Sequence, residues 1–136
     1  MHRFEEAALA LLRVVSGLML MQHGAQKLFG WLGGYRGEPG NTAELVSRAG
    51  LAGVLEFFVA ALLVAGLFTR PVAFLLSGLM AFAYFIGHAS DGFWPIVNRG
   101  ELAVLYCFVF FCLSARGGGR YSVDGVLARR RRTGDG

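Results

Sequence analysis

Charged side chains are scarce in this sequence. Asp, Glu, Lys and Arg make up 16% of the residues, against roughly 25% in an average soluble domain. Hydrophobic residues make up 55% of the 136-residue chain, so a soluble domain of this size would lack polar surface. The composition therefore disfavours a soluble fold and favours a single membrane-embedded domain.

Cysteine is also scarce, and no motif of a known catalytic chemistry occurs. Cys107 and Cys112 are five residues apart, which places them on different sides of a helix and disfavours a disulfide between them. No CxxC, HExxH, GxSxG, P-loop or GxGxxG motif is present. Nothing in the spacing of His23 and His88 selects a metal, so no metal site is predicted.

Four long apolar stretches predict an all-α, membrane-embedded four-helix bundle. The predicted helices cover about 7–29, 51–68, 71–87 and 101–115, the second with a helical lead-in that Asn41 would cap. A spanning helix needs about 20 residues, so the short third and fourth helices are expected to extend or to thin the bilayer locally. A soluble bundle would need a polar face on each helix, and these stretches offer almost none.

Positive charge predicts how the bundle is oriented. Four spans place both termini on one side, and the positive side chains of that side outnumber those of the other. They are Arg3, Arg70, Arg116, Arg120 and Arg129 to Arg132, against Lys27, Arg36, Arg48 and Arg99. Positive residues mark the cytoplasmic side, so we expect a multi-pass protein of the cell membrane with both termini cytoplasmic.

The C-terminal arginine run divides the chain into two parts. Residues 1–128 are expected to form the transmembrane domain, and 129–136 a basic cytoplasmic tail. A nucleic-acid-binding protein would carry its charge along a folded face. Here the charge follows a hydrophobic body, which favours the membrane surface over nucleic acid.

Ionisable side chains of the apolar stretches are expected to form one layer near the outer surface. Each such group costs about 2.5–3.5 kcal/mol on insertion scales, so each needs a physical role. Successive helices run in opposite directions and bring the groups to a similar depth. The candidate ligand-binding residues are His23, Lys27, Glu56, His88 and Glu101. Glu56 is expected to pair with Lys27 or His23, and no catalytic residue is assigned.

A purely structural interpretation of this layer stays open. Lys27 and Glu101 lie near helix ends and could reach the interface, and an ion pair at Glu56 could simply fix the helix packing. Arg13, a structural ionisable residue, lies about 15 Å from His23 along the helix. It would hold either a lipid phosphate or a carbonyl-rich helix end.

Helical spacing predicts which faces point inward. Arg13, Gly17 and Gly24 share one seam of the first helix, where the glycines would admit a neighbouring helix. On the fourth helix we expect an inward stripe, with Tyr106 pointing elsewhere. That stripe is Glu101, Leu105, Phe108 and Cys112.

Several segments, in their order and spacing, resemble the DoxX family of small integral membrane proteins. The resemblance runs from Arg13 to about Leu127 and leaves the arginine tail outside. It is carried by Arg13-Val-Val-Ser-Gly17, Gln22-His-Gly-Ala-Gln-Lys-Leu-Phe-Gly30, Glu56, Gly66-Leu-Phe-Thr-Arg70, His88, Phe93-Trp94, Asn98, Glu101, Leu105-Tyr106 and Gly117-Gly-Gly-Arg-Tyr-Ser-Val-Asp124.

The resemblance implies a four-helix membrane fold and a link to membrane redox or oxidative-stress complexes, since the family is named after a subunit linked to thiosulfate:quinone oxidoreduction. It thus implies a redox-associated subunit whose polar layer binds quinone. Histidine or lysine beside a carboxylate could hydrogen-bond a quinone oxygen and hand over a proton.

Two other functions stay open, and so does the question whether the chain is an enzyme. The first is a non-catalytic scaffold that recruits redox or stress-response partners. The second is transport of a small solute, which four short helices could perform only in an oligomer. The expected partners are the lipid bilayer, a membrane or peripheral redox protein and further copies of the chain.

Overall fold

The computed structural model describes residues 2–134, which form helices and loops without a β-strand. The first helix is α1 (His2–Phe29). The second is continuous through α2 (Arg48–Val54), the π-helical turn η2 (Leu55–Val59) and α3 (Ala60–Ala65). The third comprises α4 (Thr69–Ala83), the π-helical turn η3 (Tyr84–His88) and the 3-10 turn η4 (Ala89–Asp91). The remaining elements are η1 (Tyr35–Gly37), α5 (Pro95–Asn98), α6 (Glu101–Arg116) and α7 (Val123–Gly134).

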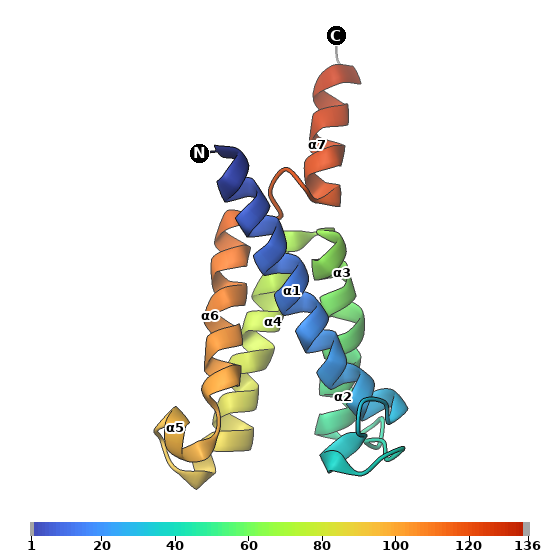
Figure 1. Cartoon of the computed structure of the whole chain (residues 1–136), viewed down its shortest axis with the longest axis vertical. Helices are drawn as coiled ribbons and strands as arrows, with labels where there is room; N and C mark the ends of the chain where they lie inside the picture. Colours follow the sequence, from blue (N-terminus) through green and yellow to red (C-terminus); the bar gives the residue numbers. More distant parts are fainter. Residues whose placement is uncertain (1, 135–136) are drawn as a thin grey trace.

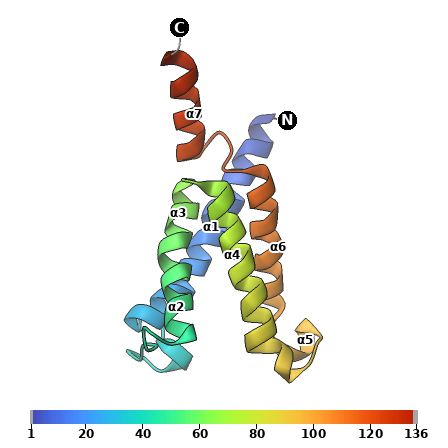
Figure 2. The same ribbon diagram turned by 180° about the vertical axis from the view of Figure 1, so that it is seen from behind.

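Four long helices form the body of the molecule, as the sequence predicts. Figures 1 and 2 show α1 crossing the α2–α3 helix, with α4 and α6 side by side next to them. The start of α1 and the end of α7 lie at the same end of the bundle, and α7 extends away from it (Figure 1). The η1 and α5 loops lie at the opposite end. We call these the terminal end and the loop end.

The second helix begins at Arg48, a few residues before the predicted start at about 51, and without the predicted lead-in from Thr42. Its N-cap is Ser47, whose hydroxyl accepts a hydrogen bond from the Gly50 amide at 3.1 Å. Asn41 instead donates its side-chain amide to the carbonyl of Tyr35 at 3.3 Å and holds the preceding loop. The predicted helical lead-in capped by Asn41 is therefore wrong. Asn41 and Ser47 are both residue types that can cap a helix, but Ser47 is the cap and Asn41 holds the loop.

Polarity is distributed in the opposite way to that of a soluble protein. Large apolar side chains are exposed around the helices, including Phe74, Phe82 and Phe108, whereas Arg13 and Glu56 are buried. Exposed apolar surface on this scale marks contact with a membrane or a partner. Two helices, Arg48–Ala65 and Thr69–Asp91, are by length and composition able to cross a membrane, with mean hydropathies of 1.9 and 1.8.

Glycines of α1 set its close contact with the second helix. A Cβ added to Gly24 would lie 2.7 Å from the backbone nitrogen of Phe57, and one added to Gly17 would lie 2.7 Å from a side-chain carbon of Val64. Both glycines are buried in the seam that Arg13 shares. The prediction that these glycines admit a neighbouring helix is confirmed, and the neighbour is the second helix.

The predicted inward stripe of α6 is wrong. Leu105, Phe108 and Cys112 are exposed. α6 carries apolar residues on all of its own faces, so the periodicity of its sequence did not distinguish the inward face from the outward one. The buried residues of α6 are Ala103, Tyr106, Phe110 and Leu113. Tyr106 therefore points into the bundle and joins the core around Leu20, Leu63 and Leu76.

Candidate functional site

A cavity of about 300 Å³ lies between the four long helices, toward the loop end. Four of its lining residues are candidate ligand-binding residues from the sequence: His23, Lys27, Glu56 and His88. The fifth candidate, Glu101, is the exposed first residue of α6 and does not line the cavity. The other lining residues are Leu20, Met80, Ala83, Arg99, Leu102, Ala103 and Tyr106.

A buried ion pair joins two walls of the cavity. The Nζ of Lys27 on α1 lies 2.6 Å from each carboxylate oxygen of Glu56 on η2. The Glu56 side chain is 5% exposed and that of Lys27 is 21% exposed. The expected pairing of Glu56 is confirmed, with Lys27 as its partner. Because the charges of Lys27 and Glu56 cancel, the pair gives the cavity a polar wall without net charge. Such a wall suits a polar, uncharged group in the cavity.

His88 is held by the loop that precedes α6. Its Nδ1 lies 3.0 Å from the carbonyl oxygen of Asn98, so Nδ1 carries the proton and donates it to this acceptor. Asn98 is buried and donates its side-chain amide to the Gly92 carbonyl at 2.7 Å, while its Oδ1 accepts from the Gly100 amide. The loop thereby fixes the tautomer of His88. The Nε2 atom takes no part in this contact.

Two cavity residues lie on π-helical turns. Glu56 belongs to η2, which interrupts the second helix between α2 and α3, and His88 belongs to η3, which lies between α4 and the 3-10 turn η4. A π-turn adds a residue to the turn and rotates the following side chains, and such turns occur frequently at functional sites. These two turns help to direct Glu56 and His88 into the same space.

Tyr106 and Arg99 are cavity residues that sequence reasoning missed. Arg99 is an exposed residue with a φ of 59°, after α5. Tyr106 is 5% exposed, and its hydroxyl has no hydrogen-bond partner among residues 2–134. An unsatisfied buried hydroxyl costs about 1–3 kcal/mol. Tyr106 shares the buried face of α6 with Ala103 and Phe110, and the apolar pattern of that helix carried no signal that could have found it.

No group of three or more His, Cys, Asp or Glu residues that could hold a metal occurs within residues 2–134. The cavity instead offers a lysine–glutamate pair, two imidazoles, a guanidinium and a phenol. These groups can donate and accept hydrogen bonds and exchange protons. The rest of the cavity wall is apolar and includes Leu20, Met80 and Leu102.

Arg13 occupies a separate polar junction near the terminal end. Its guanidinium donates to the carbonyl of Leu63 at 2.7 Å, to the carbonyl of Val64 and to the carbonyl of Tyr121 at 2.8 Å. Leu63 and Val64 lie in the last turn of α3, where the Leu63 carbonyl also accepts from the backbone amide of Gly66 at 3.0 Å. Of the two predicted roles for Arg13, holding a carbonyl-rich helix end is the one observed.

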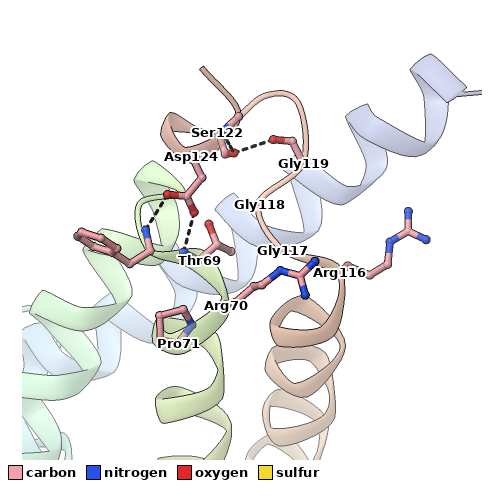
Figure 3. A pocket seen from close by; sticks show the side chains of 11 residues that line it. Thr69, Arg70, Pro71, Arg116, Gly117, Gly118, Gly119, Ser122 and Asp124 are labelled. Carbon is pink, nitrogen blue, oxygen red and sulfur yellow. Dashed lines mark hydrogen bonds between the residues drawn. The ribbon is translucent and has the colours of Figure 1, made fainter. Parts of the chain in front are cut away.

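Asp124 connects α7 to the start of α4. Figure 3 shows its carboxylate accepting hydrogen bonds from the backbone amides of Phe68 and Thr69, at 2.9 and 2.8 Å. Burial raises the pKa of Asp124, but these hydrogen bonds and the charge of Arg13 outweigh burial, and its pKa lies below the ordinary value. Ser122 caps α7 by accepting from the Gly125 amide at 3.0 Å.

A helical bundle with apolar outer faces and an internal polar cavity favours a small membrane protein over a soluble one. The DoxX family model matches residues 8–89. The chain is also 39% identical to a Haemophilus influenzae protein described as an uncharacterized protein, over 96% of this chain and 98% of that relative. The chain therefore belongs to the DoxX family, a family of membrane proteins. No solved structure matches it.

Proposed function

We propose that this DoxX protein is a redox-associated membrane subunit that binds the polar head of a quinone in the cavity near the loop end. The observation that carries the proposal is the set of His23, Lys27, Glu56 and His88 around one cavity. These side chains reach it from three different helices. Ligand sites of this kind combine apolar walls with a few convergent polar groups.

The proposed roles follow from the contacts. Lys27 and Glu56 neutralise each other and would orient the head group through hydrogen bonds. His23 and the Nε2 of His88 would exchange protons with quinone oxygens. The electrons would come from a reduced membrane or peripheral redox partner, since these side chains carry none. Glu101 would influence this site only through its charge at the rim.

The proposed orientation places both ends of the chain in the cytoplasm and the cavity near the outer surface. Its support is the arginine-rich terminal end, where Arg70, Arg116 and the four tail arginines lie. All four long helices would cross the bilayer, with 1–128 as the membrane domain and 129–136 as the tail. The continuous helix α7 covers this boundary up to Gly134.

Quinone titration of the purified protein in nanodiscs tests the function. We expect saturable binding of ubiquinone or menaquinone at micromolar concentrations, and at least tenfold weaker binding for His23→Ala and Glu56→Gln. Arg36→Gln, which lies in the exposed η1 turn outside the cavity, is the matched control. The absence of binding at tens of micromolar, or binding that all three variants retain unchanged, would reject the proposal.

A scaffold function is the second candidate, and α7 favours it. This helix extends away from the bundle and exposes Arg129 to Arg132, which could recruit an acidic partner (Figure 1). Crosslinking and purification from native membranes would then yield a stoichiometric partner that is lost when the four arginines are replaced by glutamine. A chain that is recovered alone would argue against this candidate.

A further inference from the structure

We propose that Tyr106 donates a hydrogen bond to a carbonyl-type oxygen of the cavity ligand, and that a hydrocarbon chain of the same ligand lies in the groove between α1 and α6. This inference rests on the proposed function and adds the chemistry of both halves of the ligand. It makes Tyr106 a specificity-determining residue and gives the ligand a route into the bilayer.

The hydroxyl of Tyr106 is a donor in need of an acceptor. It is buried in the cavity wall, and no residue in the described part of the chain bonds to it. The two oxygens of Glu56, which are acceptors in the same cavity, accept from Lys27, and neither accepts from Tyr106. Buried tyrosine hydroxyls usually find a partner. An oxygen acceptor on the ligand supplies one.

The ring of Tyr106, which lines the cavity, is held in place by stacking. It stacks on Phe110 with ring centroids 5.4 Å apart and an angle of 8° between the planes. Phe110 is fully buried in the core, as is Leu20 nearby. The ring therefore has no low-energy route to an exposed position. A ligand that binds must approach the hydroxyl, and not the reverse.

An apolar groove of about 510 Å³ adjoins the cavity. Leu102 and Tyr106 line both spaces, so the groove and the cavity adjoin along one face of α6. The groove exists because α1 packs mainly on the second helix and only sparsely on α6. From the cavity it follows α1 from Met19 back to Ala8, about 16 Å at 1.5 Å per residue. This is roughly half the hydrocarbon thickness of a bilayer.

The groove accepts a hydrocarbon chain better than a polar group. Its walls include the exposed side chains of Leu11, Val15 and Leu105. The one hydroxyl of its α1 wall, that of Ser16, is already donated to the carbonyl of Leu12 at 2.6 Å. A chain that begins at the cavity therefore gains apolar contact along the groove, while its head keeps the hydrogen bond of Tyr106.

Two quinone probes separate the head from the chain. Ubiquinone without a side chain and decyl-chain ubiquinone are titrated against the wild type, Tyr106→Phe and Val15→Trp in nanodiscs. Tyr106→Phe removes only the hydroxyl and should weaken both probes about fivefold to tenfold. Val15→Trp fills the groove and should reduce the affinity for the decyl probe to that for the chainless probe, without affecting the latter.

Leu75→Trp is the matched control, since Leu75 is exposed on α4 and lines neither space. It should leave both affinities unchanged, and thermal unfolding of all variants reports whether they fold. Equal affinity of the wild type for the two probes would overturn the chain placement. Unchanged binding in Tyr106→Phe, with binding lost in Glu56→Gln, would overturn the role of Tyr106 alone. Failure of the wild type to bind either probe would reject this inference and the proposed function together.

Discussion

The Nζ of Lys27 lies 2.6 Å from both carboxylate oxygens of Glu56, and this pair joins α1 to the π-helical turn of the second helix. The partners are 29 positions apart in the chain. Removing one partner of a buried pair leaves an uncompensated charge, whereas removing both can be nearly neutral. The pair therefore links the helix packing to the charge of the cavity.

Breaking this pair should destabilise the protein, and the loss should be larger when Lys27 is replaced than when Glu56 is replaced. We expect Lys27→Met to lower the free energy of unfolding by about 3 kcal/mol, because it leaves the 5% exposed carboxylate of Glu56 unpaired. Glu56→Gln should cost less, because Lys27 retains some exposure. The double variant should resemble the milder single one in thermal unfolding in detergent. A double variant with the sum of both losses would show that the two charges are not coupled.

Gly24 should tolerate no side chain. A Cβ there would lie 2.7 Å from the Phe57 nitrogen and 2.8 Å from the Gly53 oxygen, and backbone atoms cannot yield as side chains do. Gly24→Ala should therefore destabilise the protein by about 1–3 kcal/mol. Gly78→Ala is the control, since nothing lies within 4 Å of a Cβ at that position. Equal melting temperatures of the two variants would contradict the close contact of the helices.

Arg13→Lys should loosen the start of α7 although it keeps the charge. The guanidinium bonds to α3 and to the Tyr121 carbonyl at once, and a lysine ammonium lacks the planar fork that spans two acceptors. We expect faster amide hydrogen exchange in 117–128 than in the wild type. Exchange in α4 serves as the internal reference, and an unchanged pattern in 117–128 would argue against this role of Arg13.

The connection of α7 to α4 should weaken in acid. The pKa of Asp124 is lower in the folded chain than the ordinary value of 3.8, so folding favours its charged form. The resulting stabilisation is fully present above the ordinary value and is lost as the pH falls through the lower folded pKa. The protection of the Phe68 and Thr69 amides from hydrogen exchange, relative to the intrinsic rate at each pH, should fall in that range. Asp124→Asn, which cannot ionise, should remove this part of the pH dependence.

Membrane orientation can be tested with single cysteines in a background where Cys107 and Cys112 are replaced by serine. Gly33→Cys lies at the loop end and Thr133→Cys at the terminal end. In intact cells a membrane-impermeant maleimide should label Gly33→Cys alone, and permeabilisation should expose Thr133→Cys. The reverse labelling would invert the proposed orientation and place the cavity near the cytoplasm.

Several features of the site could be predicted from the sequence because they follow from depth along a helix. Reversal of direction between helices is enough to bring His23, Lys27 and Glu56 to one level. Depth does not give the rotation of a helix about its axis. α6 is apolar on all sides, so the inward face of Tyr106 and the outward face of Leu105 could not be assigned from the pattern.

The sequence alone determined that the chain is helical and apolar, that Gly17 and Gly24 admit a neighbour, and that it belongs among DoxX-like proteins. The first two properties depend on composition and on spacing within one helix, and the third rests on a resemblance of segments along the chain. Only the tertiary structure decided that Lys27 rather than His23 pairs with Glu56, that Arg13 holds the end of α3, and that an apolar groove between α1 and α6 adjoins the cavity. Those outcomes depend on the rotation of each helix about its axis and on the angles between helices. π-turns and long-range caps set both through contacts between residues far apart in the chain, which a local sequence pattern does not show.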